Sequence, residues 1–169
     1  MTAHYASLKA LLMDVDGVLT DGSIWLDAQG QEMKRFHVWD GAAIQWLQKQ
    51  GIPVGWITGR SSVAVQTRAR ELGVVLRDGV REKQASYQEF LALWNLQESE
   101  TGYIGDDLID IPVLKRVGFS FAVENACDEV KQCAQYITQK SGGSGAVREI
   151  IELILKSQEK WTQVLRSFS

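Results

Sequence analysis

Asp14-Val15-Asp16-Gly17-Val18-Leu19-Thr20 overlaps the end of the first apolar run of the chain, which extends from Leu8 to Val15. A short apolar run of this kind predicts a buried β-strand. Gly17 permits the turn that brings the carboxylates of Asp14 and Asp16 into one pocket, where Asp14 suits a nucleophile and Asp16 an acid/base group. Taken alone, two carboxylates two residues apart are more typical of a solvated turn. A catalytic role for this pair therefore depends on the polar residues that end the other strands.

Short apolar runs alternate with longer amphipathic ones along the rest of the chain. Short buried runs predict strands, and apolar residues at helical spacing predict helices. The alternation predicts an α/β fold, with a three-layer Rossmann-like parallel sheet that carries helices on both faces. In such sheets the ligand lies beyond the carboxyl ends of the strands. We expect strands over 8–15, 52–57, 74–76, 102–105, 119–123 and 136–138, and helices over 41–50, 61–72, 83–96, 110–117, 127–134 and 146–160.

Two segments interrupt this alternation. Residues 21–40 contain two β-prone runs around a turn with Gly30, which predicts a β-hairpin that serves as a flap or an oligomer contact. Residues 141–145, Ser-Gly-Gly-Ser-Gly, have the composition of a flexible linker. After them we expect the last helix and then a frayed tail. The whole chain, 1–169, is expected to form one domain.

Composition and charge exclude several classes of function. Hydrophobic residues make up 45% of the 169 residues and charged residues 23%, which is typical of a globular protein. The net charge of −3, without a long run of one sign, argues against nucleic acid as the main partner. Cys127 and Cys133 have no metal-ligand spacing and are expected to be free thiols. Neither a signal-peptide pattern nor an apolar run of about 20 residues is present, so we expect a cytoplasmic protein outside the membrane.

Polar residues with phosphate and metal chemistry follow the other expected strands. Thr58-Gly59-Arg60 supplies a hydroxyl and backbone N–H groups at a strand-to-helix turn, which suits a phosphate cradle. Lys83 opens the third helix and can neutralise a phosphate oxygen. Gly105-Asp106-Asp107 ends the fourth strand, with Asp110 three residues on, and carboxylates there can complete a magnesium site. Individually these residues are equally typical of helix caps and solvated charges; all of them in this order at strand ends is much rarer.

Together these four motifs resemble those of the haloacid-dehalogenase superfamily of phosphatases, over nearly the whole chain. The resemblance implies that Asp14 attacks phosphorus and forms an aspartyl-phosphate, while Asp16 protonates the leaving oxygen and then activates water. It implies that Thr58, Gly59, Arg60 and Lys83 bind the phosphoryl group. It also implies a magnesium site formed by Asp14, the backbone carbonyl of Asp16, and Asp106.

A closer resemblance is to the cap-less 3-deoxy-D-manno-octulosonate 8-phosphate phosphatases of lipopolysaccharide biosynthesis. The residues that carry it are Phe36-His37-Val38-Trp39-Asp40-Gly41, the run from Gly102 to Asp110, and Gly142-Gly-Ser-Gly-Ala-Val-Arg-Glu149. It implies a homotetramer in which a neighbouring subunit covers each active site, and in which the C-terminal tail can reach a neighbouring site. Trp39 and Ser144 depart from the family's usual basic residues, which leaves nine-carbon sugar-acid 9-phosphates or a relaxed range of sugar phosphates as alternative substrates. Lys34, Arg35 and Arg60 remain as cations for a sugar-acid carboxylate or the phosphate.

Three other classes of protein are less consistent with the sequence. A response-regulator receiver carries its phospho-accepting Asp after the third strand, where this chain has Arg77-Asp78 in a loop. A regulatory domain without activity would not need the intact motifs. A dinucleotide-binding enzyme is disfavoured because no G-x-G-x-x-G follows the first strand.

Overall fold

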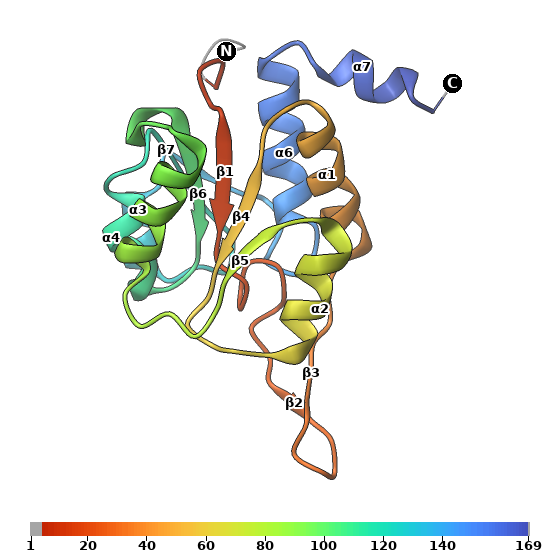
Figure 1. The fold of residues 1–169 in the computed structure, drawn as a ribbon, viewed down its shortest axis with the longest axis vertical. Coiled ribbons are helices and arrows are strands. Elements are labelled where there is room, and N and C mark those ends of the chain that lie inside the picture. The colour runs from red at the N-terminus through yellow and green to blue at the C-terminus, as the bar shows by residue number, and fades with distance from the viewer. Residues whose placement is uncertain (1–4, 169) are drawn as a thin grey trace.

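A parallel six-stranded sheet forms the centre of the molecule (Figure 1). The structure is a computed structural model that describes residues 5–168. The expected strands and their parallel pairing are confirmed, with bounds that differ by a few residues at the ends. In spatial order the strands are β5 (Val75–Arg77), β4 (Val54–Ile57), β1 (Ala10–Met13), β6 (Thr101–Gly105), β7 (Phe119–Ala122) and β8 (Tyr136–Ile137).

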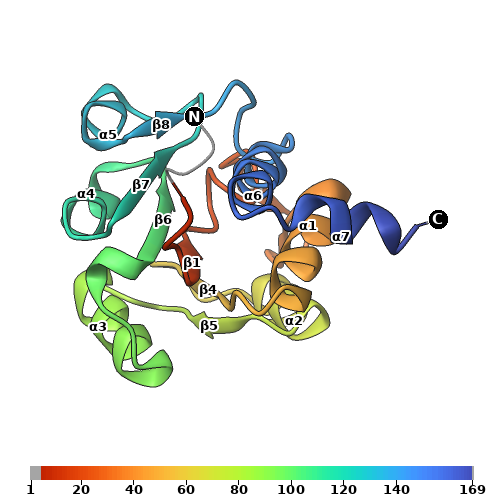
Figure 2. The ribbon, with the colours of Figure 1, turned by 90° about the horizontal axis from the view of Figure 1, so that it is seen from above.

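Helices cover both faces of this sheet, which gives the three layers expected from the sequence (Figure 2). One layer contains α1, α2 and α6, and the other contains α3, α4 and α5. Gly73 ends α2 in the left-handed conformation, as its place in the sequence predicts. The helices are α1 (Val38–Lys49), α2 (Val63–Leu72), α3 (Lys83–Trp94), α4 (Ile111–Leu114), α5 (Asp128–Cys133) and α6 (Ala146–Ser157), with 3-10 helices η1 (Glu98–Glu100) and η2 (Leu108–Asp110).

The position of β1 determines where chemistry can occur. All four residues of β1 are buried, and the strand pairs with β4 on one side and β6 on the other. Met13 lies opposite Trp56 of β4 and Ile104 of β6, so these three strands end at one level. The residues that follow them, among them Asp14, Thr58 and Asp106, therefore meet at one edge of the sheet.

The C-terminal residues differ from the expected frayed tail. They form a further helix, α7 (Trp161–Arg166), which lies at the end of the molecule opposite the hairpin (Figure 1). Val164 is buried, and the ring of Trp161 contacts that of Trp46 on α1 at a centroid distance of 5.9 Å. The guanidinium of Arg148 covers the Trp46 ring at 4.1 Å. Long-range aromatic packing of this kind, invisible in local periodicity, orders the segment.

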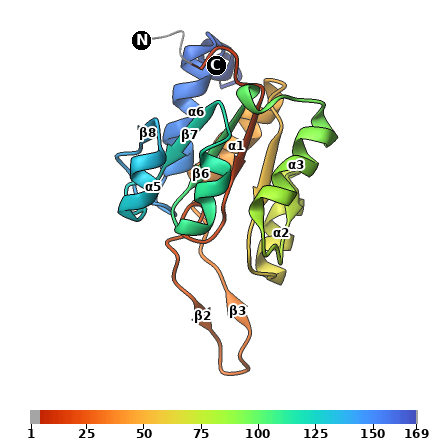
Figure 3. The same cartoon turned by 90° about the vertical axis from the view of Figure 1, so that its left-hand side faces the viewer.

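The expected hairpin is present and projects from the carboxyl edge of the sheet (Figure 3). Its two strands, β2 (Trp25–Leu26) and β3 (Glu32–Met33), pair in antiparallel fashion. Asp27 organises the turn, because its Oδ1 accepts hydrogen bonds from the backbone N–H groups of Gln29 and Gln31. Across residues 5–168, none of the helices has the length and apolar content needed to cross a bilayer.

The glycine run 141–145 is not a flexible linker, and that expectation is wrong. Gly142 and Gly143 are buried against the loop that follows β1. The N–H of Gly143 donates to the carbonyl of Val18 at 3.0 Å, and a Cβ on Gly142 would lie 1.7 Å from the carbonyl oxygen of Gly17. The glycines are therefore needed for close backbone approach rather than for mobility.

Gly142→Ala is expected to destabilise the fold by about 1–3 kcal/mol and to lower phosphatase activity, because its Cβ has to displace the loop that carries Asp16 and Gly17. Urea denaturation and steady-state rates measure both effects. Gly51→Ala is the control, since a Cβ on Gly51 meets nothing within 4 Å. It has to overcome only a positive φ and should retain wild-type activity. Equal activities of the two variants would contradict the close approach.

Candidate active site

Asp14 lies at the carboxyl end of β1, where its side chain is only 6% exposed. Its backbone N–H donates to the carbonyl of Ile104, so the sheet itself fixes its position. Its Oδ1 is 2.7 Å from the Nζ of Lys83, which begins α3. A buried carboxylate next to a lysine is expected to be anionic and close to a site where a second anion can bind.

Lys83 is held between two carboxylates. Its Nζ is 2.7 Å from Asp110 as well as from Asp14, and its side chain is buried. Burial by itself would lower the pKa of Lys83, but the charges of Asp14 and Asp110 outweigh it and raise the pKa, so the lysine stays protonated. A fixed cation at this place suits a phosphoryl oxygen.

Asp110 organises the site rather than providing a free ligand. Its Oδ1 accepts hydrogen bonds from Lys83 and from the hydroxyl of Tyr103, each at 2.7 Å. Its Oδ2 accepts from the backbone N–H groups of Asp106 at 3.0 Å and Asp107 at 3.3 Å. The sequence indicated Asp110 as a magnesium or helix-start acid and missed Tyr103, because β6 reads simply as an apolar strand.

Asp106 completes a cluster of carboxylates that suits a divalent cation. Oxygen atoms of Asp14, Asp106 and Asp110 lie within 4.8 Å of one another. Among residues 5–168, the buried Oδ1 of Asp106 has no hydrogen-bond partner. A Cβ on Gly17 would lie 2.0 Å from the Oδ2 of Asp106, and Gly17 has a φ of +92°. Glycine at this position thus lets the main chain approach the carboxylate, and the oxygen-rich donor set fits magnesium.

The pKa values of the clustered carboxylates also favour a bound cation. Burial and the charge of Asp14 raise the pKa of Asp106 to about 8. Burial also raises the pKa of Asp14 to about 6, although the charge of Lys83 opposes this shift. Carboxylates crowded in this way carry more negative charge than Lys83 alone offsets, and a cation relieves the repulsion.

Magnesium affinity of the protein is expected to rise with pH between about pH 6 and pH 8. The raised pKa values mean that a proton occupies Asp106, and partly Asp14, at the lower pH, and the metal has to displace it; each displaced proton changes the affinity by about tenfold per pH unit. Calorimetry in buffers of different ionisation enthalpy measures both the affinity and the protons released. An affinity independent of pH, with no proton release, would contradict the assignment. Asp106→Asn is the matched variant and should show a weaker pH dependence.

Asp16 faces a different neighbour from Asp14. Its Oδ1 is 2.5 Å from the Nζ of Lys34, a residue of the hairpin, and that ammonium also contacts Glu32 at 2.8 Å. Burial by itself would lower the pKa of Lys34, but the hydrogen bonds to Asp16 and Glu32 outweigh this effect and raise the pKa. Because the side chain of Lys34 is 1% exposed, this lysine is not a free cation for a substrate carboxylate, contrary to that expectation.

The turn after β4 lies at the same edge of the sheet. The hydroxyl of Thr58 is buried and accepts a hydrogen bond from the backbone N–H of Arg60 at 3.3 Å. The guanidinium of Arg60 lies 3.4 Å from Glu32 of the hairpin and is half-exposed. Ser62 is the residue before α2, but its side chain makes no capping hydrogen bond. The turn is thus ordered, with Thr58 inside and Arg60 at the surface.

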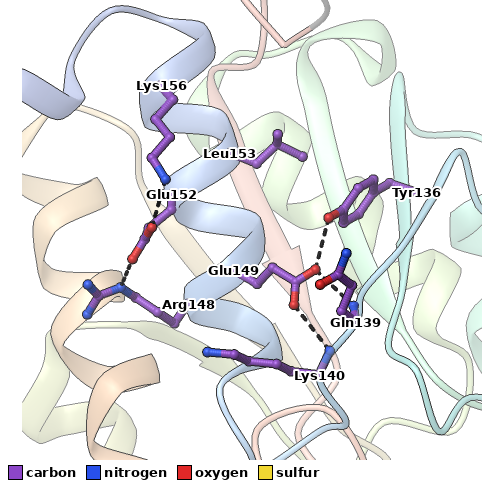
Figure 4. Close-up of a pocket in the computed structure, with 8 residues that line it drawn as sticks. All are labelled: Tyr136, Gln139, Lys140, Arg148, Glu149, Glu152, Leu153 and Lys156. Carbon is purple, nitrogen blue, oxygen red and sulfur yellow. Dashed lines mark hydrogen bonds and ion pairs between the residues drawn. The ribbon is translucent and has the colours of Figure 1, made fainter. Parts of the chain in front are cut away.

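The cavity shown in Figure 4 lies elsewhere, between β8 and α6. It has a volume of about 320 Å³, and both of its carboxylates already have partners within the protein. Glu149 accepts a hydrogen bond from the hydroxyl of Tyr136, while Glu152 pairs with Arg148 and Lys156. Because Glu152 is paired with two cations and Glu149 is hydrogen-bonded, the carboxylate cluster at the sheet edge is the better candidate for chemistry.

Lys140 is a cation that sequence analysis missed. Its Nζ lies 5.2 Å from the centre of the Trp39 ring and would be 3.4 Å from a Cβ on Gly145. It therefore places a positive charge next to Trp39 and close to Ser144. These are the two positions at which the octulosonate phosphatases usually have basic residues and this chain does not. Only the folding of the glycine run brings these segments together.

Comparison with known proteins gives consistent matches. The family model of haloacid dehalogenase-like hydrolases matches residues 75–151. The 3-deoxy-D-manno-octulosonate 8-phosphate phosphatase KdsC of Yersinia pestis is 44% identical over 156 residues, which cover 92% of this chain and 83% of the relative. The same enzyme of Escherichia coli K12 is 39% identical over 159 residues, or 94% of this chain and 85% of the relative.

A solved structure gives the same result. The phosphatase of this name from Moraxella catarrhalis, in complex with magnesium, phosphate and KDO, superposes with a TM-score of 0.96 at 39% identity, over 99% of this chain and 97% of that one. No cap domain is present within residues 5–168. With its parallel sheet, its carboxylate cluster and these relatives, the chain belongs to the haloacid-dehalogenase superfamily and, within it, to the family of cap-less 3-deoxy-D-manno-octulosonate 8-phosphate phosphatases.

Proposed function

We propose that this chain is a magnesium-dependent phosphoric monoester hydrolase that acts on 3-deoxy-D-manno-octulosonate 8-phosphate through an aspartyl-phosphate on Asp14. The observation that carries the proposal is the buried Asp14, held 2.7 Å from Lys83 and beside Asp106 at the carboxyl edge of the sheet. The relatives that share 39–44% of their residues with this chain bear the name of that phosphatase.

The residues divide the reaction between them. Asp14 attacks phosphorus, and Asp16 gives a proton to the leaving sugar oxygen and then takes one from the attacking water. Thr58, Gly59, Arg60 and Lys83 hold the phosphoryl oxygens. Asp14, Asp106 and the backbone carbonyl of Asp16 would bind magnesium, which supplies positive charge that offsets the repulsion between the two anions.

The choice of sugar acid depends on a second group of residues. Because Trp39 and Ser144 stand where the octulosonate phosphatases usually have basic residues, a related nine-carbon 9-phosphate, or a relaxed range of sugar phosphates, is the second candidate. The adjacent Lys140 favours an acidic sugar in either case, because its ammonium lies beside Trp39. An eight-carbon sugar acid remains the first choice, since the match to the relatives named above covers more than 90% of this chain.

A phosphate-release screen with magnesium tests this proposal. It compares the eight-carbon and nine-carbon sugar-acid phosphates with simple hexose phosphates. The eight-carbon acid is expected to give the highest kcat/KM. Comparable rates on all substrates would indicate a relaxed pocket, and no magnesium-dependent release from any of them would contradict the phosphatase itself.

We also expect a homotetramer of single-domain subunits in the cytoplasm, assembled through the hairpin. Four apolar side chains of the hairpin, Ile24, Trp25, Leu26 and Met33, are between 52% and 62% exposed, and an isolated two-stranded ribbon is marginally stable in water. Light scattering at micromolar concentration should give four times the subunit mass. Trp25→Lys should dissociate the assembly, whereas Leu93→Lys, which replaces an exposed leucine on α3, should not. A monomeric wild-type protein would contradict the proposal.

A further inference from the structure

Lys34 is the buried cation of the hairpin. It follows β3 directly, and its side chain is 1% exposed although the strands before it project into solvent. Its Nζ bridges Asp16 at 2.5 Å and Glu32 at 2.8 Å. Burying a lysine is costly unless its charge is paired, so these two carboxylates fix the side chain in one position.

The segment that carries Lys34, the second half of the hairpin, is anchored before and after this residue. Before it, Glu32 lies 3.4 Å from the guanidinium of Arg60, in the turn after β4. After it, the ring of Phe36 stacks on Trp56 of β4 with an interplanar angle of 14° and a centroid distance of 6.3 Å. The position of the ammonium is therefore determined by the sheet rather than by the exposed tip of the hairpin.

The contact with Lys34 makes the two oxygens of Asp16 different. Oδ1 is occupied by the ammonium of Lys34. Oδ2 is buried, and within the described part of the chain it has no hydrogen-bond partner. A carboxylate held by one oxygen has little freedom to rotate, so the other oxygen keeps a fixed direction.

We propose that Lys34 is a positioning residue for the acid/base carboxylate, which it holds by Oδ1 of Asp16 so that Oδ2 exchanges the proton. The inference rests on the proposed phosphatase function. In the first step the proton on Oδ2 passes to the sugar oxygen as its bond to phosphorus breaks and the bond from Asp14 forms. In the second step Oδ2 takes a proton from water as the water oxygen bonds to phosphorus and Asp14 is released with free phosphate.

Glu32 has a part in the same arrangement. It shares the ammonium with Asp16 and also contacts Arg60, so a single chain of charges runs from the acid/base loop to the phosphate-binding turn. The hairpin therefore contacts both loops through charged side chains. Through these ion pairs the hairpin contributes to the active site of its own subunit, separately from any contact with a neighbouring subunit.

Lys34→Met tests the proposal, because it removes the ammonium and keeps an unbranched side chain. The kcat for a sugar phosphate is expected to fall by about 100-fold, with KM changed by less than about threefold. Lys34→Arg keeps the charge and should stay within about tenfold of the wild type. Lys9→Met is the matched control, since it removes the exposed lysine that pairs with Glu100, and it should leave kcat unchanged.

A second readout separates positioning from a general structural defect. With p-nitrophenyl phosphate the leaving group departs without a proton, so Lys34→Met should release one equivalent of nitrophenolate per subunit quickly and then turn over slowly. Asp16→Asn combined with Lys34→Met should be no slower than Asp16→Asn alone, because both changes act through one carboxylate. If the Met variant does not fold, Lys34→Gln replaces it in both measurements.

Three results would overturn the inference while the wild type remains an active phosphatase. They are an unchanged kcat in Lys34→Met, equal losses in the burst and steady-state phases, and multiplicative losses in the double variant. A wild type without magnesium-dependent phosphate release would instead refute the proposed function, so the two failures are distinguishable.

Discussion

Asp14→Asn is expected to reduce phosphate release by at least about 10⁴-fold while the protein remains folded. The amide is a poor nucleophile, so no aspartyl-phosphate can form. The fold should tolerate the change, because Lys83 keeps its ion pair with Asp110 and the amide relieves repulsion within the carboxylate cluster. Steady-state assays with malachite green detection and circular dichroism measure the two effects.

Asp128→Asn is the control for this variant, because Asp128 is exposed on α5 and is not one of the three clustered carboxylates. It should retain full activity. Mass spectrometry after an acid quench provides a direct readout, since the wild type should gain the mass of one phosphoryl group and Asp14→Asn should not. Near-normal turnover by Asp14→Asn would show that another group attacks phosphorus.

Lys83→Met is expected to destabilise the protein by about 3–5 kcal/mol and to remove most of the activity. The substitution leaves the buried carboxylates of Asp14 and Asp110 without their common cation. The loss of stability should be larger at about pH 8 than at about pH 5, because protonation neutralises carboxylates that have no counter-ion. Urea denaturation at both pH values measures the difference.

Magnesium provides a further test of the Lys83 variant. Added magnesium should restore part of its stability, since the cation offsets the same negative charges. Lys9→Met again serves as the control, because an exposed lysine–glutamate pair contributes only about 0–1 kcal/mol. A Lys83 variant as stable as this control at every pH would contradict the buried ion pair.

The sequence predicted the sheet and the candidate reacting residues because both leave local signals. Each strand is a short apolar run, and the polar residues that matter follow those runs directly, as Asp14, Thr58 and Asp106 do. Parallel strands bring such residues to one edge whatever the details of packing. The roles of the four motifs needed a second source, namely their resemblance to a known superfamily, because each motif alone is equally typical of a turn or a cap.

Two features depended on contacts between distant segments and could not be predicted. The glycine run 141–145 has the composition of a linker, but it packs on the loop after β1 because Gly142 and Gly143 allow the two backbones to touch. The C-terminal segment forms α7 because the ring of Trp161 packs against that of Trp46 on α1. No local pattern in the sequence encodes either partner.

The same distinction runs through the active site. The sequence by itself determined the fold class, because strands leave local signals. Together with the resemblance to a known superfamily, it also predicted the nucleophile and the class of reaction. Only the tertiary structure decided that Asp110 holds Lys83, that Lys140 lies beside Trp39, and that Lys34 holds Asp16. For Lys83 and Lys34 the physical reason is burial: a charged side chain removed from water takes the partner that the fold places beside it, and sequence distance does not limit that choice.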